Sequence, residues 1–491
     1  FLTPEAINEA GELEWVVRVQ TPRGIFDVPA GSLWPIVRLP HLARFEVEPS
    51  WAIRTLQMEP KVRAAQVRAV SDVVKDVGVI ANAYNSRTQP DVFFSADFEM
   101  NLRFNENRIR PYNAETLPMD FLKCGAYRLR EPFEQTPVRV CVVNTLSMRL
   151  EDFVEAMRRQ LDRHFPFTID VVRERQVRVV ARKNLESAVR VVEKESPDVI
   201  LAFFADEAGA DDDEDTDTDA TAAYMRSLTL GRGIPTHVIR QSTLDDPDAM
   251  PAIIMSILGK TGSSPFVLTE PLEEADFVVG LDVVRQYIKT TGETRMTAIA
   301  RVYRSDGEFM QYAVRDFSQT GDQIPYVLMR DLFPQRQFTG KRIILHYPGE
   351  FPADLLAAIR GWGMAIKATF YPVEIIRTGA PRIYATGKGG ISQPPWGSAF
   401  RMSDTEALLV SSLPTENVTP QPLHIRTVSA GSSPLPIGAV LRSVLVWSLL
   451  AYGAERLPKL PVTVLNAEQL REWLGRGGQL LPGEGRVPFW L

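Results

Sequence analysis

Apolar positions along one part of the chain alternate between strand-like runs and helical spacing. Residues 138–143 form a nearly uninterrupted apolar run, which is typical of a strand buried on both faces. Residues 150–164 repeat apolar side chains at helical spacing, and residues 199–204 and 236–239 predict two more strands. The apolar positions of the helix are Phe153, Met157 and Leu161. We expect one compact α/β domain here, ending near residue 265.

A second α/β unit begins with three apolar runs that predict neighbouring strands. The runs cover residues 277–284, 296–303 and 309–316. Ser305-Asp306-Gly307 separates the last two, and a polar turn with glycine predicts a hairpin. Further strands and a helix are predicted at residues 342–346, 353–362, 372–376, 407–410 and 424–428. This order is of the ribonuclease H kind, although such α/β patterns are common and leave the function open.

The first hundred residues show short apolar runs interrupted by prolines. A helix is predicted at residues 62–77, within an N-terminal α+β and linker region whose residues reveal no chemistry. We expect no membrane span, because Arg442 interrupts the apolar run at residues 437–452 and no stretch of about 18 residues is free of charges and breakers. The first residue is Phe1, which leaves a preceding segment and any targeting signal open.

Length and composition indicate a globular protein of several domains. With 491 residues, 45% of them hydrophobic, the chain can bury a sizeable core in roughly three or four domains. Cys124 and Cys141 form no metal-binding pattern, which argues against structural zinc and for a reducing compartment, so cytoplasm is the expected location. Gly259-Lys260-Thr261 is no phosphate-binding loop of the Walker type, because Ile254 stands where its first glycine belongs.

Acidic and basic residues are nearly balanced outside one short acidic segment. The formal charge is −6 at pH 7, whereas a nucleic-acid binder usually carries a basic surplus. Residues 211–219 contain seven acidic groups and no basic one, and without them the formal charge becomes +1. We interpret this run as a solvated surface loop, and the alternative is an electrostatic gate over a basic groove.

Three segments, in this order, resemble the MID and PIWI domains of Argonaute proteins. Residues 224–239, YMRSLTLGRGIPTHVI, are similar to the family's helix and GIPTQ-V strand. Residues 252–262, AIIMSILGKTG, are similar to its N-L-x-x-K-x-x-x-K-x-G helix. Residues 277–285, FVVGLDVVR, are similar to F-I-G-I-D-V-x-R, the strand that carries the family's first catalytic aspartate.

The resemblance implies a fold and a division into domains. A Rossmann-like MID domain would occupy residues 137–265, and a ribonuclease H-like PIWI domain residues 266–491. Residues 98–136 would be the linker into MID, after an N-terminal region of uncertain type at residues 1–97. Because this region is too short for both an N and a PAZ domain, the chain resembles a short or PAZ-less prokaryotic Argonaute; a partly observed longer protein is the alternative.

In the family, the MID domain holds the 5′ end of a guide strand. A 5′ phosphate is satisfied by lysine, a tyrosine hydroxyl and a polar amide. On this resemblance Lys260 matches a family lysine, whereas Ser256 stands at the place of another lysine and His237 replaces a glutamine. Tyr224 would supply a stacking ring, and Arg226 would stand in for the lysine of the helix. The alternative is ordinary packing for the tyrosine and histidine, and an exposed helix end for the lysine.

The apolar end of the chain is a further point of resemblance. The last four residues, PFWL, are similar to the tail that brings the family's terminal carboxylate toward the guide 5′ end. Leu491 would therefore help to hold a magnesium ion there. The alternative is a tail that only packs on the core.

The nuclease site implied by the resemblance is degenerate. Ribonuclease H chemistry needs several carboxylates around two divalent ions. Asp282 matches the first aspartate, but Pro348 stands at the second and has no metal-binding side chain. Asp316 and Asp322 are the acids nearest the expected mobile glutamate, and Glu468 fits the fourth position. We therefore expect no catalytic metal pair and no nuclease activity.

The function that the resemblance implies is guide-directed recognition of target DNA without cleavage. The guide is expected to be RNA, and the role would be defence against invading plasmid or viral DNA. Members of this kind act with an effector protein, which is sirtuin-like, a TIR protein or a nuclease. One alternative is a scaffold of the same fold that binds only proteins. The other is an active metal-dependent nuclease with the ligands Asp282, Asp316 or Asp322, Glu350 and Glu468.

Overall fold

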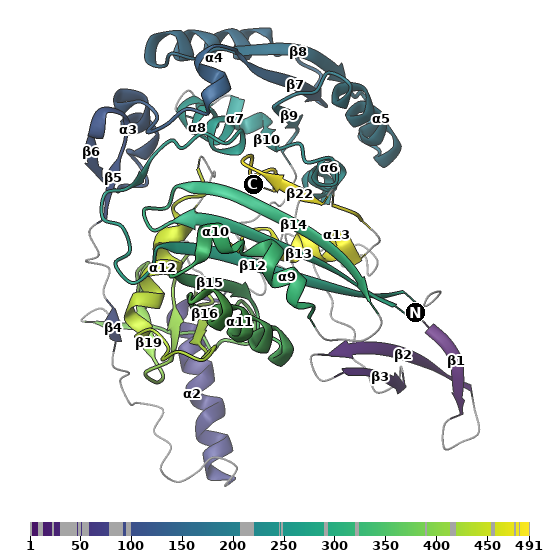
Figure 1. Cartoon of the computed structure of the whole chain (residues 1–491), viewed down its shortest axis with the longest axis vertical. Coiled ribbons are helices and arrows are strands. Elements are labelled where there is room, and N and C mark those ends of the chain that lie inside the picture. Colours follow the sequence, from purple (N-terminus) through teal and green to yellow (C-terminus); the bar gives the residue numbers. More distant parts are fainter. Residues whose placement is uncertain are drawn as a thin grey trace. The chain divides into compact units, whose positions relative to one another are not determined.

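The computed structural model of the chain is shown in Figure 1. It describes residues 2–7, 13–21, 24–29, 47, 51, 58–77, 92–94, 100–206, 220–244, 246, 249–288, 293–319, 324–387, 390–412, 419–452, 457–475, 478–480 and 482–490. Contacts group the chain into two compact units, Phe1–Leu56 and Gln57–Leu491. The acidic run at residues 211–219, Asp322 and Leu491 lie outside the described residues.

The first unit contains a three-stranded antiparallel sheet in the order β1-β2-β3. Its strands are β1 (Leu2–Ile7), β2 (Leu13–Thr21) and β3 (Gly24–Pro29). In β2 and β3 the pairing runs from Val16 opposite Pro29 to Thr21 opposite Gly24, so these two strands form a hairpin.

The second unit begins with elements that lead into the first α/β domain. They are α2 (Pro60–Asp76), β4 (Val92–Phe94), β5 (Asn101–Arg103), η3 (Asn105–Asn107), β6 (Ile109–Pro111), α3 (Leu117–Cys124) and η4 (Glu131–Glu134). Helix α2 confirms the helix predicted at residues 62–77. It begins at Pro60. Proline fits the first turn of a helix because the N–H groups there have no hydrogen-bond partner within the helix, so proline loses no hydrogen bond. Strands β5 and β6 form a small antiparallel sheet with β11 (Val267–Leu268).

The first α/β domain contains a parallel sheet in the order β10-β9-β7-β8. The strands are β7 (Val138–Asn144), β8 (Ile169–Gln176), β9 (Val199–Phe204) and β10 (Thr236–Arg240). Every residue of β9 is buried, as expected of a central parallel strand that helices cover on both faces. The helices are α4 (Glu151–His164), α5 (Arg182–Glu193), α6 (Ala220–Leu230), α7 (Gln241–Leu244) and α8 (Met250–Lys260). This Rossmann-like arrangement confirms the strands and the first helix predicted from the sequence.

A ten-stranded mixed sheet forms the second α/β domain, in the order β22-β14-β13-β12-β15-β16-β21-β20-β19-β4. Its strands after β4 are β12 (Phe277–Ile288), β13 (Glu293–Arg304), β14 (Phe309–Gln319), β15 (Arg342–Pro348), β16 (Thr369–Ile376), β19 (Ala399–Arg401), β20 (Glu406–Leu409), β21 (Leu423–Thr427) and β22 (Gly483–Gly485). Strands β13 and β14 form the hairpin predicted at residues 305–307, where Gly307 has a φ of 86° that favours glycine. Strands β17 (Ala385–Gly387) and β18 (Gly390–Ser392) form a separate pair.

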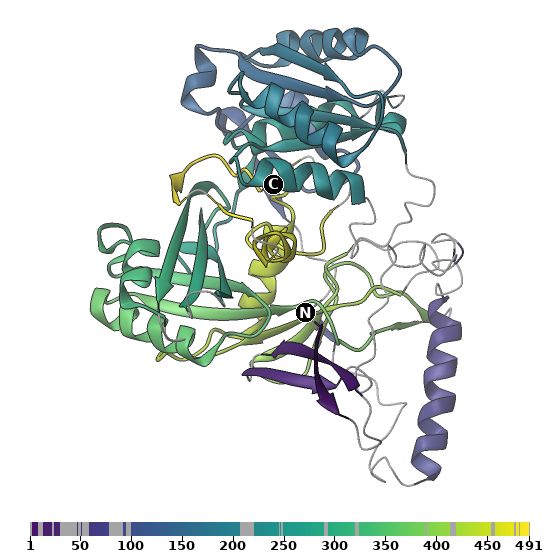
Figure 2. The ribbon, with the colours of Figure 1, turned by 90° about the vertical axis from the view of Figure 1, so that its right-hand side faces the viewer.

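Helices cover both faces of the ribonuclease H-like part of this sheet. On one face lie α9 (Tyr326–Leu332) and α11 (Ala353–Ile366), which share an apolar cluster with β12, β13 and β15; α10 (Gln335–Phe338) adds Phe338. The other face carries α13 (Ala467–Gly475), and α12 (Ile437–Ser448) packs against β20 and β21. The C-terminal segment, yellow in Figures 1 and 2, packs its side chains Leu470 and Trp490 with Leu230 of α6. None of the helices in the described part of the chain combines the length and hydropathy that a membrane span requires.

A close backbone approach joins β12 to the turn at residue 463. A Cβ atom on Gly280 would lie 2.0 Å from the carbonyl oxygen of Thr463, so only glycine fits here without a shift of the backbone. The same turn contacts β15, where the Thr463 hydroxyl lies 2.8 Å from Nδ1 of the fully buried His346. On the other side of the ring, Nε2 of His346 lies 3.0 Å from Oγ of Ser443 in α12.

The hydrogen bonds of Ser443 determine the tautomer of His346. The Ser443 hydroxyl donates to the carbonyl of Val440 over 2.7 Å, so its oxygen accepts from Nε2–H of the ring. Nδ1 is then the acceptor for the Thr463 hydroxyl. This neutral ring is the form that burial favours, and burial lowers the pKa of His346 to about 3.

Replacing His346 with glutamine is expected to flatten the pH dependence of stability. The pKa of His346 is lower in the folded than in the unfolded protein, so its stabilising effect is complete above about pH 6.5 and is lost as the pH falls toward 3. Between pH 7 and pH 5 the wild type should lose about 2 kcal/mol more unfolding free energy than the variant. Urea unfolding at the two pH values measures this, and equal losses in both proteins would contradict it.

Candidate nucleic-acid interface

A cluster of basic groups lies where α6, β10 and α8 meet. His237 on β10 and Lys260 at the end of α8 are partly buried, and the charge of Arg226 on α6 lowers the pKa of both. The Lys260 ammonium donates to the carbonyl of Thr236 over 3.0 Å. Nδ1 of His237 lies 3.1 Å from Oγ of Ser256. The fold thus brings together three of the residues that sequence analysis proposed for a guide 5′ end.

The electrostatics of this cluster favour an anion. Burial and the charges of Lys260 and Arg226 hold the pKa of His237 well below its ordinary value. Burial and the charge of Arg226 lower the pKa of Lys260 to about 7. Among the described residues, neither His237 nor Lys260 pairs with a carboxylate. A bound anion would offset the mutual repulsion of these groups and stabilise their charged forms.

Tyr224, the other proposed guide-binding residue on α6, lies apart from the cluster. Its hydroxyl donates to Oε1 of Glu186 on α5 over 2.6 Å, and the Arg182 guanidinium lies 5.1 Å from the ring centre. Residues two positions apart on a helix point in different directions, which separates Tyr224 from Arg226. The ring packs in the apolar cluster between α5 and the sheet and is not placed to stack beside Lys260.

The described residues supply no set of ligands for the magnesium ion that the resemblance implies at this position, so that expectation stays a prediction. Arg226 and Lys260 repel a cation, and His237 has its Nδ1 atom beside Ser256. Within the described part of the chain, no group of three or more His, Cys, Asp or Glu side chains could hold a metal ion. The proposed carboxylate ligand, Leu491, lies outside the described residues. The described cluster therefore suits direct binding of an anion.

The second candidate site lies at the ends of two parallel strands, β12 and β15. Gly280 pairs with His346, so Asp282 and Pro348 lie level with each other, each two residues further along its strand. If both residues were aspartates, this arrangement would place their carboxylates side by side, where they could bind metal ions. Pro348 contributes only its backbone carbonyl to the site.

An arginine occupies the space between these two strand ends. Nε of Arg471, on α13, donates to Oδ1 of Asp282 over 2.7 Å, and Nη1 donates to the carbonyl of Pro348 over 2.9 Å. The guanidinium also lies 5.4 Å from the centre of the Tyr347 ring. Asp282 is 1% exposed and the Arg471 side chain 33%. Sequence analysis missed Arg471, since one basic residue on a short helix resembles any solvent-facing position.

The other acids considered as metal ligands are engaged elsewhere or not described. Asp316 accepts a hydrogen bond of 2.6 Å from the Thr297 hydroxyl and pairs with Arg295. Glu350 is 60% exposed and pairs with Arg426. Glu468 is the second residue of α13, but its side chain lies outside the description, as does the whole of Asp322.

A second arginine, Arg301 on β13, lies beside the same carboxylate. It is 1% exposed, donates from Nη1 to the carbonyl of Thr463 over 2.7 Å, and lies 5.1 Å from the centre of the Trp490 ring. Its Nε and Nη2 atoms have no hydrogen-bond partner among the described residues. Burial lowers the pKa of Arg301, and the nearby charge of Asp282 opposes that shift. The charge of Asp282 therefore acts on both Arg471 and Arg301.

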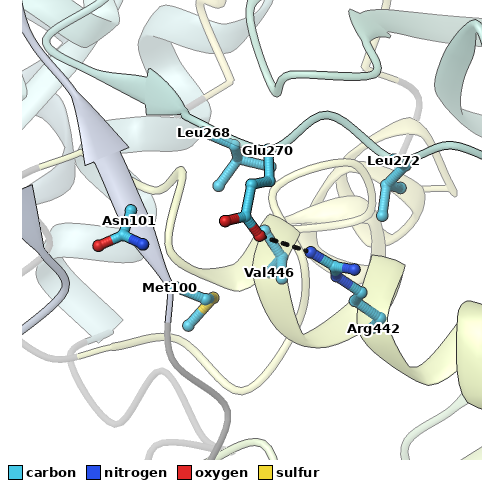
Figure 3. Close-up of a pocket in the computed structure, with 7 residues that line it drawn as sticks. All are labelled: Met100, Asn101, Leu268, Glu270, Leu272, Arg442 and Val446. Carbon is cyan, nitrogen blue, oxygen red and sulfur yellow. Dashed lines mark ion pairs between the residues drawn. The ribbon is translucent and has the colours of Figure 1, made fainter. Parts of the chain in front are cut away.

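A small pocket away from both sites lies between β5, β11 and α12 (Figure 3). Glu270 and Arg442 face each other across it, with their charged atoms 3.5 Å apart. Its lining residues are Met100, Asn101, Leu268, Glu270, Leu272, Arg442 and Val446. Glu270 is 63% exposed, and such surface pairs contribute little stability. The pocket offers no arrangement of groups that implies a reaction.

The fold and these sites define a class of protein: a ribonuclease H-like domain preceded by a Rossmann-like domain with a cluster of basic side chains. No family model matches the sequence. The chain is 25% identical, over 276 residues, to the protein argonaute of Aquifex aeolicus (strain VF5). That alignment covers 55% of this chain and 38% of the relative. Over this part of its length, the chain is therefore homologous to an Argonaute protein.

Solved Argonaute structures have the same fold. One is the crystal structure of Aa-Ago with externally bound siRNA, which has a TM-score of 0.74 and 19% identity and covers 97% of this chain. Another is Clostridium butyricum Argonaute bound to a guide DNA (5′ deoxycytidine) and a 19-mer target DNA, with a TM-score of 0.65, 14% identity and 99% coverage of this chain. The chain spans 66% and 67% of these two proteins. These likenesses confirm the predicted MID-PIWI fold.

Proposed function

We propose that this chain binds a guide strand by its 5′ end and recognises a complementary target without cutting it. The observation that carries the proposal is the basic cluster of Arg226, His237 and Lys260, in which neither His237 nor Lys260 pairs with a carboxylate of the described residues. A terminal phosphate would supply His237 and Lys260 with a negative charge and several hydrogen-bond acceptors. The guide is RNA and the target is DNA in this proposal, as the sequence resemblance implies.

The solved relatives support the nucleic-acid part of the proposal. One is described with externally bound siRNA, and another with a guide DNA and a target DNA. A guide held in this way would recognise its target by base pairing, whereas the protein would contact mainly the backbones. Specificity would then depend on the guide, and affinity on the protein.

The absence of cleavage in this proposal rests on the contacts of Arg471. Two-metal hydrolysis requires carboxylates that are available to bind cations. The carboxylate of Asp282 already accepts from a guanidinium, and a proline stands level with it on β15. A cation that approached Asp282 would have to displace Arg471 and would meet its charge. This arrangement favours recognition over the alternative of an active nuclease.

The proposal includes an effector protein that acts together with this chain. A member that recognises DNA without cutting it needs an effector, and the resemblance implies a sirtuin-like, TIR or nuclease partner in defence against invading DNA. Affinity purification from cells that carry a plasmid, followed by mass spectrometry, would identify such a partner. Recovery of the chain with nucleic acid but with no second protein would remove the effector from the proposal.

The guide is tested by purifying the protein from cells and extracting the nucleic acid bound to it. We expect short RNA of uniform length with a 5′ phosphate, sensitive to RNase and not to DNase. The variant Lys260→Met, purified in parallel, should retain much less. If no nucleic acid remains after a high-salt wash and the protein binds no added guide, the scaffold alternative replaces this proposal.

Binding of a 5′-phosphorylated guide is expected to weaken as the pH rises above 7. In the free protein the pKa of Lys260 is about 7, and an adjacent phosphate raises it, so binding at higher pH requires uptake of a proton. From pH 7 to pH 8.5 at constant salt, the affinity should fall about tenfold. A guide with a 5′ hydroxyl and the variant Lys260→Arg are the controls, and both should show a flat profile. The same fall with either guide would contradict this role of Lys260.

A further inference from the structure

Among the described residues, the His237 ring has one hydrogen-bond partner, a buried serine. Oγ of Ser256 lies 3.1 Å from Nδ1 of the ring, and Ser256 is 1% exposed on α8. The other ring nitrogen, Nε2, has no partner among the described residues, and the His237 side chain is partly exposed. The distance alone allows either Oγ or Nδ1 to be the donor, so the surroundings decide the direction of this hydrogen bond.

The burial of Ser256 decides which group donates. A buried serine in a helix usually donates to a backbone carbonyl of the preceding turn, as Ser443 and Ser448 on α12 do over 2.7 and 2.6 Å. Ser256 makes no such bond in the described part of the chain, where Nδ1 of His237 is the acceptor within its reach. If Nδ1–H donated instead, the buried hydroxyl hydrogen would be left unpaired, which is unfavourable. The hydroxyl therefore donates to Nδ1, and the neutral ring has its hydrogen on Nε2.

The groups around His237 also oppose a second proton on the ring. Burial and the charges of Lys260, one turn after Ser256 on α8, and of Arg226 on α6 lower the pKa of His237. A protonated ring would have an N–H on both nitrogens, and the Ser256 hydroxyl would then lose its acceptor. The ring therefore stays neutral and keeps Nε2–H as its free donor.

An uncharged donor suits this place in the basic cluster. The Lys260 ammonium uses one of its three N–H groups for the carbonyl of Thr236 and already offers positive charge to a phosphate. A cation at His237 would add repulsion, whereas a neutral N–H adds a hydrogen bond without it. We propose that Ser256 fixes His237 as the Nε2–H tautomer, in which the ring is an uncharged donor to the terminal phosphate of the guide. Ser256 is then a positioning residue, and the inference rests on the proposed function because it requires that phosphate.

The tautomer is measured by NMR on the full chain with nitrogen-15 in its histidines, through correlations between ring nitrogens and ring protons. The chain has five histidines, and the signal of His237 is the one that the variant His237→Gln lacks. We expect the pattern of a neutral Nε2–H ring at about pH 7, with and without a phosphorylated guide. His346, whose Nε2–H donates to Ser443, provides the reference pattern. An Nδ1–H pattern or a protonated ring at His237 would overturn the inference.

Binding is then measured with guides that carry a 5′ phosphate or a 5′ hydroxyl. Ser256→Ala removes the hydroxyl that fixes the tautomer, so the affinity for the phosphorylated guide alone should fall about fivefold and an Nδ1–H population should appear in the spectrum. His237→Gln should keep most of the affinity, because its amide N–H is also an uncharged donor. The matched control is Ser448→Ala, which removes a buried hydroxyl from α12 and should change neither the His237 signal nor the affinity.

The outcomes distinguish this inference from the proposed function. If Ser256→Ala binds the phosphorylated guide as the wild type does, or if Ser448→Ala weakens binding equally, Ser256 only packs between α8 and β10 and the inference is wrong. If the wild type binds no guide at all although His237 shows the Nε2–H pattern, the proposed function fails, and the role of the ring as a phosphate donor fails with it.

Discussion

Replacing Arg471 with methionine is expected to lower the unfolding free energy of the PIWI domain by about 3 kcal/mol. The change leaves the carboxylate of Asp282, which is 1% exposed, without its direct counter-charge. Breaking a buried ion pair in this way costs about 3 to 5 kcal/mol, and the lower value applies because Arg471 is partly exposed. Adding Asp282→Asn should restore most of the loss, since a neutral amide is far less costly to bury.

Chemical denaturation followed by tryptophan fluorescence measures this effect. The variant Arg285→Met serves as the comparison, because it also removes an arginine that pairs with an aspartate but leaves Asp354, which is 29% exposed and can be solvated. Its loss should stay below about 1 kcal/mol. A small loss in Arg471→Met, or no recovery when Asp282→Asn is added, would show that this ion pair does not support the strand ends.

The variant Lys260→Met is expected to have the second large effect, which is weaker binding of the guide. Loss of one partly buried ammonium from the basic cluster should reduce the affinity for a 5′-phosphorylated guide by about 100-fold at pH 7, since charge-assisted hydrogen bonds to phosphate are among the strongest in proteins. A guide with a 5′ hydroxyl should bind equally to both proteins. The folded protein should not lose stability, because Arg226 repels the Lys260 charge in the absence of a ligand.

The loss of a specific phosphate contact is distinguished from a general loss of positive charge by testing both guides with Lys260→Met and with a control variant. Lys194→Met removes an exposed lysine at the end of α5, far in sequence from the cluster, and should leave both affinities nearly unchanged. Fluorescence anisotropy with each guide and a thermal melt of each protein give the four comparisons. Equal weakening for phosphorylated and unphosphorylated guides would place the phosphate elsewhere.

The basic cluster places like charges together where a phosphate is proposed. Arg226 lowers the pKa values of His237 and Lys260. Placing like charges together is unfavourable in the free protein, and a phosphate relieves that cost. Binding affinity and pH dependence are therefore expected to change together in variants of these residues.

The fold and the order of its parts could be predicted from the sequence. Strands buried on both faces require runs such as residues 199–204, and amphipathic helices require spacing such as that of Phe153, Met157 and Leu161, so local pattern predicts both. The hairpin after β13 was predictable because Gly307 permits a positive φ. The place of Pro348 at the end of β15 also followed from the chain, since strand order and length bring it level with Asp282.

The contents of the two sites were decided only by the tertiary structure. Arg471 reaches Asp282 across 189 positions of sequence, and no local pattern encodes a hydrogen bond between them. Tyr224 and Arg226 are neighbours in the chain, yet the turn of α6 directs the tyrosine to Glu186. Side-chain direction and charge pairing depend on how separate elements pack. The sequence predicted only that a metal ligand is missing at Pro348, whereas the packing of α13 places Arg471 there.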